Sequence, residues 1–339
     1  MQANPVLVEA IRGTMVENRH RGAFVVCDAE GNIVAAAGDI DHPIFPRSAV
    51  KSIQALAMFT SGADRQFDLT DEELALACAS HHGEDVHIAG VTAFLGHLGL
   101  DVAALECGAH QPNNPAAREA LRRDARNPTA LHNNCSGKHT GMLAVARALG
   151  AATTGYVERD HPVQREVRRV IELVIGEPLS TERCGTDGCS IPTWAAPLRA
   201  FARGFARMAV GDLPEDLGDA ARRVFDAATS HPLLVAGSGH FDTLVMEAFG
   251  GRVMQKGGAE GVQCGAIRDR GWGYALKCDD GNMTASIAMA AELLLALGEP
   301  NEEQRTVLLR FAQPGIRNVR GLEVGEMRAA EALREVLRR

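Results

Sequence analysis

The sequence contains no uninterrupted apolar stretch long enough to cross a bilayer. Its first residues, Met-Gln-Ala-Asn-Pro, also lack the positive segment and the apolar segment of a secretion signal. No basic block extends beyond short clusters such as Arg222-Arg223, and the formal net charge is −8. These absences argue against a membrane-spanning protein and against a nucleic-acid partner. We therefore expect a cytoplasmic protein that acts on a small molecule.

Internal repeats, low-complexity stretches and Pro/Ser-rich linkers are also missing. The chain has 339 residues, and its hydrophobic share of 46% supplies an ample core. We expect one domain over residues 1–339, with a sheet region at about 5–45 and 250–339 and a helical region at about 46–249.

The eight cysteines include no Cys-x-x-Cys pair. In a chain of this size and expected location they indicate thiols or metal ligands rather than a disulfide framework. Apolar or strand-like surroundings predict that three of them are small buried side chains: Cys27, Cys78 and Cys278. Glycines and polar residues surround another three: Cys135, Cys184 and Cys189.

Strand patterns occur at both ends of the chain and helical patterns between them. A hairpin is predicted over 22–38, and three later strands over 252–256, 261–268 and 271–277. Helices are predicted over 48–59, 71–79, 86–98, 116–124, 138–149, 162–175, 194–208, 217–229, 283–297, 302–311 and 323–339. We therefore expect an α/β (α+β) fold in which about five antiparallel strands carry the terminal helices on one face and the helical block on the other. The helix that starts at Ser48 is expected to lie against this sheet.

The run Arg47-Ser48-Ala49-Val50-Lys51 places a hydroxyl and an amine one helical turn apart. In a dry site, where Lys51 is neutral, its nitrogen can take the Ser48 proton and create a nucleophile for acyl transfer. A helix capped by Ser48, with a solvated Lys51 in its first turn, produces the same letters.

Two further elements carry similar residue types. Ser80 and His81 follow a predicted helix, and Lys256 ends a predicted strand beside Gly257. The order of Ser-x-x-Lys, a middle Ser and a late Lys-x-Gly resembles the plan of penicillin-recognising serine hydrolases. The middle element is Ser-His-His rather than Ser-x-Asn, and the last is Lys-Gly-Gly rather than Lys-Thr-Gly, which counts against a β-lactam or peptidoglycan substrate.

A third set of residues has the chemistry of metal ligands. Two cysteines, one further donor and a water would make an open tetrahedral zinc site, whereas four protein ligands would make a structural one. Reduced loop thiols remain the alternative. The candidates on chemistry alone are Cys135, Cys184 and Cys189 with His132, His139 and Asp187 as ligands or orienting groups.

The chain resembles the rhizobial-type, or class 3, L-asparaginase family (asparaginase II) over nearly its whole length. Four runs carry the resemblance: 46–51 (PRSAVK), 134–139 (NCSGKH), 184–189 (CGTDGC) and 256–261 (KGGAEG). The threonine-rich signatures of the other two asparaginase classes are not recognisable. The resemblance implies hydrolysis of L-asparagine to L-aspartate and ammonia, an architecture shared with penicillin-recognising serine hydrolases and glutaminases, and a homodimer.

The resemblance also assigns roles to residues. It implies two catalytic Ser–Lys pairs, Ser48 with Lys51 and Ser80 with Lys256, and a zinc ion held by Cys135, Lys138 and Cys189. We expect Ser48 to attack the amide carbon while Ser80 and Lys256 relay protons, although acylation of Ser80 stays open. We expect the substrate to be bound by Arg47, His81, Glu84, Asn134, Asp187 and Gly257.

Three other functions stay open at this stage. One methylene gives only about 1–3 kcal/mol of discrimination, so a glutaminase is hard to exclude. The second is a β-lactamase-like or penicillin-binding acyl hydrolase. The third is a zinc-stabilised binding protein that uses the same fold without catalysis.

Overall fold

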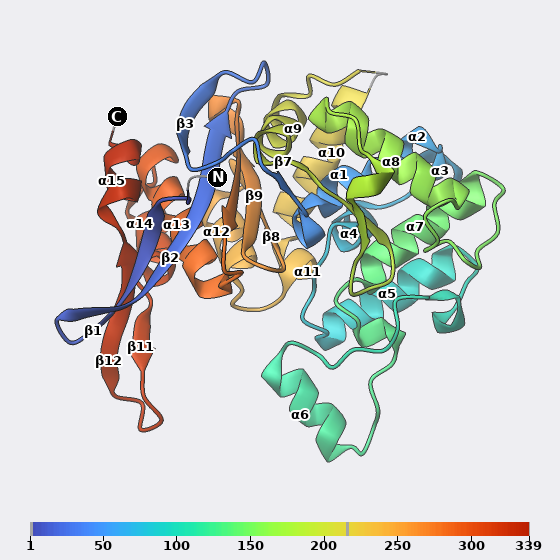
Figure 1. Cartoon of the computed structure of the whole chain (residues 1–339). Helices are drawn as coiled ribbons and strands as arrows, with labels where there is room; N and C mark the ends of the chain where they lie inside the picture. Colours follow the sequence, from blue (N-terminus) through green and yellow to red (C-terminus); the bar gives the residue numbers. More distant parts are fainter. Residues whose placement is uncertain (1–2, 215–216, 339) are drawn as a thin grey trace.

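The computed structural model describes residues 3–214 and 217–338. Its main element is an eight-stranded antiparallel sheet in which β11, β12, β1, β2, β10, β9 and β8 are successive neighbours and β3 pairs with β2 (Figure 1). Its strands are β1 (Val6–Arg12), β2 (Met15–Cys27), β3 (Ile33–Ala37), β8 (Val253–Gly258), β9 (Val262–Ile267), β10 (Trp272–Cys278), β11 (Gly315–Arg317) and β12 (Glu323–Ala329). The expected hairpin and the three late strands are confirmed, and both chain ends build the sheet.

The expectation of about five strands was too low, because β1, β11 and β12 were not predicted. Residues 323–329 were expected to begin a helix over 323–339, yet they form β12, and only α15 (Glu331–Leu337) is helical. The β12 strand pairs with β1 through five residue partners, Val8 facing Ala329 and Arg12 facing Gly325 at the two ends. This pairing joins segments more than 300 residues apart and outweighs the local charge pattern.

The helices between β3 and β8 form a block, as expected, and further helices follow β10 towards the C-terminus. They are α1 (Lys51–Ala55), α2 (Ala57–Thr60), α3 (Ala63–Gln66), α4 (Asp71–Ala77), α5 (Asp85–His97), α6 (Pro115–Arg123), α7 (Ser136–Ala148), α8 (Pro162–Ile175), α9 (Leu198–Val210), α10 (Leu217–Ser230), α11 (Pro232–Ala236), α12 (Phe241–Phe249), α13 (Met283–Leu297) and α14 (Glu302–Ala312). Of the described helices, none is long and apolar enough to span a bilayer.

Local signals explain several helix ends. A capping box between Thr70 and Glu73 starts α4, and Pro162 occupies the first turn of α8. The helix predicted over 194–208 begins only at Leu198, because the preceding residues form the short strands β6 (Pro192–Trp194) and β7 (Ala196–Pro197). The helix predicted over 48–59 is divided into a 3₁₀ turn, η1 (Arg47–Val50), followed by α1 and α2.

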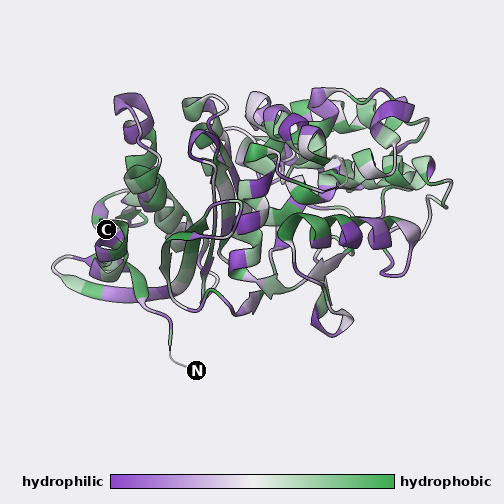
Figure 2. Ribbon diagram, turned by 90° about the horizontal axis from the view of Figure 1, so that it is seen from above, coloured by the Kyte–Doolittle hydropathy of each residue, from purple (hydrophilic) through white to green (hydrophobic). Residues whose placement is uncertain are grey.

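Alternating side chains of the sheet enter two hydrophobic cores. On β2, Val25 packs with the helical block, while Phe24 and Val26 pack with α12, α13, α14 and α15 on the opposite face. The view in Figure 2 shows the hydrophobic segments between the sheet and its covering helices and the hydrophilic segments mainly on the outer helices. The expected helix layers on the two faces of the sheet are therefore confirmed.

The 3₁₀ turn η1 lies directly against β8, which confirms that the Ser48 segment packs on the sheet. At Gly258 a Cβ atom would come within 2.6 Å of the Pro46 carbonyl and 3.0 Å of the Ala49 nitrogen. Only glycine allows the two backbones to approach this closely. The contact places Ser48 beside the strand that carries Lys256.

Candidate active site

Four elements from distant parts of the sequence bring the predicted site residues together. Lys51 opens α1, Ser80 follows α4, Lys256 lies on β8 and Cys135 immediately precedes α7. The loop around Ser80 is held by two backbone hydrogen bonds, from the Ser80 nitrogen to the Val235 carbonyl (2.8 Å) and from the His81 nitrogen to the Asn134 carbonyl (3.1 Å). The hydroxyl position is therefore fixed by α11 on one side and by the segment before α7 on the other.

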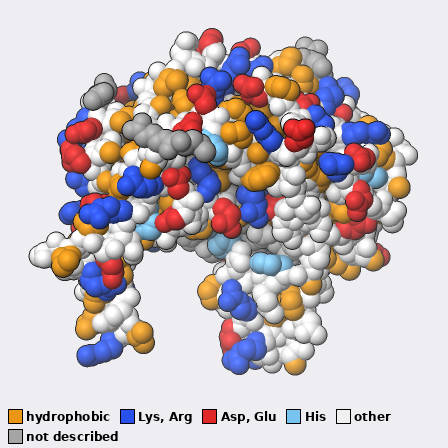
Figure 3. All heavy atoms as spheres, in the orientation of Figure 1, with side chains coloured by type: hydrophobic (Ala, Val, Ile, Leu, Met, Phe, Trp, Pro, Cys, Tyr) orange, Lys and Arg blue, Asp and Glu red, His pale blue; other side chains and the backbone are white. Residues whose placement is uncertain are grey.

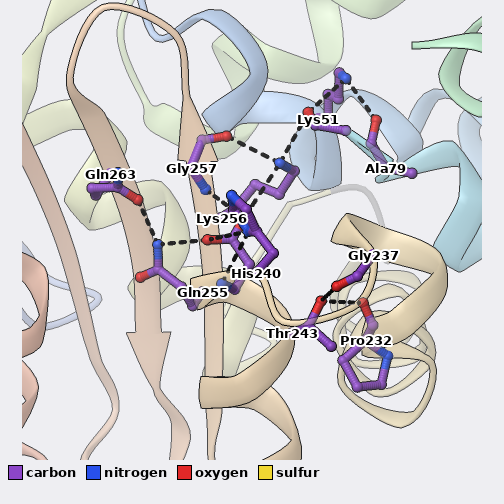
Figure 4. A network of polar contacts seen from close by, with 12 residues as sticks. Lys51, Ala79, Pro232, Gly237, His240, Thr243, Gln255, Lys256, Gly257 and Gln263 are labelled. Atoms are coloured by element: carbon purple, nitrogen blue, oxygen red, sulfur yellow. Dashed lines mark hydrogen bonds and ion pairs between the residues drawn. The ribbon is translucent and has the colours of Figure 1, made fainter. Parts of the chain in front are cut away.

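Two lysine amines meet at the Ser80 hydroxyl. The Lys51 Nζ lies 2.8 Å and the Lys256 Nζ 3.0 Å from Ser80 Oγ. Lys51 also donates to the Ala79 carbonyl at 2.6 Å, and Lys256 to the Gly257 carbonyl at 3.0 Å, as the dashed lines in Figure 4 show. Because both lysines are only 1–2% exposed, this is a dry cluster of the kind that general base catalysis by lysine requires.

Ser48 stands apart from this hydrogen-bonded cluster. Within the described part of the chain its hydroxyl makes no hydrogen bond, and the Lys51 amine contacts Ser80 instead. The expected contact between Ser48 and Lys51 is thus not formed here, although the two residues start one turn apart on η1 and α1. The expected contact between Ser80 and Lys256 is present.

Burial changes the protonation of Lys256. Burial contributes most to lowering the pKa of this amine to about 8. The Asp242 carboxylate opposes this change, and the positive charge of Lys51 adds to it. A lysine in water has a pKa near 10.4, so Lys256 exchanges its proton much closer to neutral pH.

The three predicted metal ligands also lie together. Lys138 Nζ is 2.9 Å from Cys189 Sγ, and the thiols of Cys189 and Cys135 are hydrogen bonded. All three residues are 3–5% exposed. The bond from Cys189 lowers the pKa of the Cys135 thiol well below its usual range, burial opposes this, and the amines of Lys51 and Lys138 add to it.

This donor set fits a zinc ion. Burial lowers the pKa of Lys138, but the neighbouring thiols outweigh it and leave the pKa raised, so a bound dication would have to displace the proton of this amine; three protein ligands would leave a fourth tetrahedral position open. The Cys135 sulfur is also 3.2 Å from the Lys51 amine, so the metal-ligand cluster and the Ser–Lys cluster are in direct contact. Cys184, on the short strand β5 (Cys184–Thr186), is half-buried and outside this group.

Arg47 and Asp187 form an ion pair at the edge of the cluster. The guanidinium of Arg47 contacts the Asp187 carboxylate at 2.8 and 2.9 Å. Burial raises the pKa of Asp187, but the positive charges of Lys138 and Arg47 outweigh it and leave the pKa lowered. Arg47 also lines a cavity of about 690 Å³, together with Phe45, Thr186 and Glu260.

The other residues predicted to bind the substrate make their contacts with neighbouring groups of the protein. His81 is completely buried, accepts from the Gly83 nitrogen at 3.1 Å and contacts the Ser136 hydroxyl at 2.8 Å, so its ring supports the Ser80 loop. Glu84 accepts from the nitrogen and hydroxyl of Ser238. The side-chain oxygen of Asn134 lies 3.3 Å from the Cys135 sulfur.

Two further site residues were not predicted. Asp242 is 1% exposed; it accepts from the Gly257 nitrogen at 2.9 Å and lies 3.6 Å from Lys256 Nζ. Gln255 donates to Asp242 at 3.2 Å and to Gln263 at 2.7 Å. The only sequence signal was an acidic residue in an otherwise apolar segment after His240, which is too common to identify a site.

Figure 3 shows the face of the molecule seen in Figure 1, with two projections at its lower edge. They correspond to the ends of the β1, β11 and β12 strands and to α6, and a hollow separates them. Positive and negative side chains are intermixed over this face, so it presents no continuous surface of one charge.

Comparison with known proteins gives a family for the chain. The model of the L-asparaginase II family matches residues 8–329. No curated protein sequence matches significantly.

Solved structures give only remote likenesses. Mglu in its native form is 13% identical, with a TM-score of 0.47 over 83% of this chain, and the match spans only 62% of the Mglu chain. A β-lactamase from Mycobacterium bovis is 16% identical over 80% of this chain and 94% of that one, with a TM-score of 0.38. A putative β-lactamase from Bacteroides dorei is 13% identical over 76% and 84%, with a TM-score of 0.40. At these TM-scores the likenesses carry no argument about this chain.

Proposed function

Because the chain belongs to the L-asparaginase II family, it is an amidohydrolase, and we propose that it converts L-asparagine and water to L-aspartate and ammonia by Ser–Lys nucleophilic catalysis. The observation that carries this proposal is the Ser80 hydroxyl, which lies between the amines of Lys51 and Lys256 at 2.8 and 3.0 Å. When two buried amines lie close together, one of the two lysines tends to lose its proton. The shared hydroxyl then provides a path along which a proton can move between them.

We assign the nucleophile to Ser48. Its half-buried hydroxyl makes no hydrogen bond in the described part of the chain, so no donor has to be displaced before it attacks. Lys51, one turn away, takes the Ser48 proton after its neutral amine turns from Ser80. The Ser48 oxygen then bonds to the side-chain amide carbon of asparagine.

The departure of ammonia completes the first half of the reaction. The carbon–nitrogen bond breaks, and the proton held on Lys51 passes to the leaving nitrogen, directly or through the Ser80 hydroxyl and Lys256. Water then attacks the ester on Ser48 and gives up one proton to the same amines. This releases aspartate and restores the Ser48 hydroxyl.

Binding of the amino-acid end of the substrate is assigned to the opposite side of Ser48. Arg47 and Asp187 are a paired cation and anion, and they can exchange their mutual contact for the α-carboxylate and the α-ammonium group of asparagine. A zinc ion held by Cys135, Lys138 and Cys189 would help to bind and orient these groups. Because thiolate ligands make zinc a weaker Lewis acid, this role fits the ion better than polarising the amide carbonyl.

Ammonia release from L-asparagine and, in parallel, from L-glutamine tests the proposal. We expect turnover of asparagine by the wild-type protein and a loss of at least about 10³-fold in kcat for Ser48→Ala. Ser80→Ala is expected to lose less, since it removes a proton path and not the attacking atom. Near-normal turnover by Ser48→Ala with an inactive Ser80→Ala would move the nucleophile to Ser80. A strong preference for glutamine would replace the proposed substrate.

The quaternary structure and the location follow the family resemblance. We propose a homodimer in the cytoplasm, and sedimentation velocity of the purified, metal-replete protein tests the first of these. A concentration-independent monomer would contradict it.

A further inference from the structure

Asp242 is a buried carboxylate whose place in the fold is not explained by its own helix. Among the described residues, the only aspartate or glutamate side chains classed as buried belong to Asp242 and Glu73. Glu73 caps α4 through the Thr70 nitrogen and contacts His97. Asp242 stands in the first turn of α12, where one of its oxygens lies 3.8 Å from the ring of the N-cap residue His240, and both oxygens contact residues of β8.

The contacts of Asp242 converge on the residues around Lys256. One oxygen accepts from the Gly257 nitrogen at 2.9 Å and lies 3.6 Å from the Lys256 amine. The other accepts from Gln255 at 3.2 Å. Figure 4 labels Gln255, Lys256 and Gly257, the residues of β8 that make these contacts.

The network continues away from the site into the sheet. Tyr274 donates to Gln255, which donates to Gln263, and Gln263 donates to Ser286 at the start of α13. All four residues are at most 1% exposed. Each polar group is therefore satisfied inside the protein, which makes the position of Asp242 rigid.

We propose that Asp242 is a positioning residue of the Ser–Lys site, which holds the Lys256 amine against the Ser80 hydroxyl and supplies the negative charge that the ammonium form of Lys256 requires. This inference rests on the proposed function for its catalytic consequence. Its electrostatic part rests on geometry alone, because an unpaired buried ammonium group is strongly unfavourable.

Other titratable groups face Lys256 as well. They are Lys51 of α1, Cys78 after α4, Cys135 before α7 and Cys264 of β9, and the ring of His240 lies 3.8 Å from the Asp242 carboxylate. Burial raises the pKa of Cys78 to about 12, so this thiol carries no charge near neutral pH. Burial also raises the pKa of Cys264. Asp242 is therefore the carboxylate on which the charge balance of Lys256 depends.

The experiment compares Asp242→Asn with Gln255→Met in the metal-loaded full chain. Asp242→Asn removes the charge and conserves the shape, whereas Gln255→Met removes the amide contact and leaves the charge. We expect the acidic limb of the kcat/KM profile for asparagine to move down by at least about one pH unit in Asp242→Asn, because the Lys256 ammonium loses its counter-charge. KM should change little, and Gln255→Met should retain the wild-type limb.

A second measurement does not depend on activity. Thermal unfolding at pH 6.5 is compared for wild type, Asp242→Asn, Lys256→Met and the double variant. We expect Asp242→Asn to lower Tm by about 4 °C or more in the wild-type background and by much less in the Lys256→Met background. Should Asp242→Asn fail to fold, recovery of a folded double variant is the expected result.

The two arms separate the possible failures. An unshifted pH limb in Asp242→Asn, or equal losses of Tm in both backgrounds, would overturn the role of Asp242. No ammonia release by the wild-type protein, with strong coupling in the unfolding cycle, would overturn the proposed function and leave the Asp242–Lys256 pairing intact.

Discussion

At Ser80 a single hydroxyl oxygen is shared by two lysine amines that come from α1 and β8. Such an oxygen can donate its one proton only to a neutral amine, whereas it can accept from two charged ones. The protonation of the pair therefore decides whether the hydroxyl can pass a proton in either direction.

This leads to a prediction about pH. Burial lowers the pKa of Lys256 to about 8, so the amine is charged below this pH and neutral above it. We expect kcat/KM for asparagine to rise as pH increases through about 8. Lys256→Arg, which stays charged, should remove this limb together with most of the activity. A profile that is flat from pH 6 to 9 in the wild-type protein would contradict this role of Lys256.

The thiol cluster gives a second prediction at the residue scale. We expect Cys135→Ser and Cys189→Ser to lose bound zinc. The loss of zinc affinity should exceed the ~10–100-fold that is typical when a residue hydrogen-bonded to a metal ligand is replaced. Cys184→Ser is the matched control, because this thiol lies in the same region but outside the cluster. Metal content after dialysis against a chelator, measured by mass spectrometry, checks the prediction. Equal zinc loss in all three variants would contradict the assigned ligands.

Among the elements, η1 and β8 form the contact on which the site depends. The backbone of β8 reaches η1 because Gly258 has no side chain. By contrast, a Cβ atom added at Gly96 on α5 would meet no atom within 4 Å. The same substitution at these two glycines therefore has opposite expected effects.

We expect Gly258→Ala to destabilise the protein by about 1–3 kcal/mol and to lower kcat, since a Cβ atom would push β8 away from Ser48. Gly96→Ala should be neutral or stabilise α5 by up to about 1 kcal/mol. Urea unfolding and ammonia release measure the two effects. Wild-type turnover in a folded Gly258→Ala protein would show that the close contact is not required.

At the scale of the whole molecule, the sheet joins the two hydrophobic cores. Neighbouring residues of β2, such as Val25 and Val26, belong to opposite cores, so neither core can be lost without exposing the strand that also builds the other. This arrangement favours a single cooperative unit, and one domain over 1–339 stays a prediction.

We therefore predict one transition in calorimetric unfolding of the metal-loaded protein. Removal of the metal should lower Tm by several degrees, because saturating zinc adds about 3 kcal/mol or more, but the transition should remain single. Complete unfolding on chelation would favour the zinc-stabilised binding protein over the enzyme. Two separated transitions in the metal-loaded protein would contradict the single unit.

Much of the local structure was predictable from the sequence. Helical periodicity identified α4, α5, α7, α8, α10, α13 and α14, and two strand-like runs around the turn at 28–32 identified the hairpin of β2 and β3. These elements depend on residues within a few positions of one another. The short helices α11 and α12 were missed, and with them Asp242.

The sequence by itself determined the family and the residue types of the site. The runs around Ser48, Cys135, Cys189 and Lys256 are each continuous in the chain, so their chemistry was readable without a fold. The pairing of Cys135 with Lys138 came only from the family resemblance, whereas the proximity of Ser48 and Lys51 was expected from their spacing of one helical turn.

Only the tertiary structure decided which groups touch. The Lys51 amine contacts Ser80, 29 positions away, instead of Ser48, three positions away. Arg47 pairs with Asp187 across 140 positions, and β12 pairs with β1 across almost the whole chain. Contacts of this kind arise when the two cores close and exclude water, since a buried amine must then find its partners among whatever side chains the packing brings near.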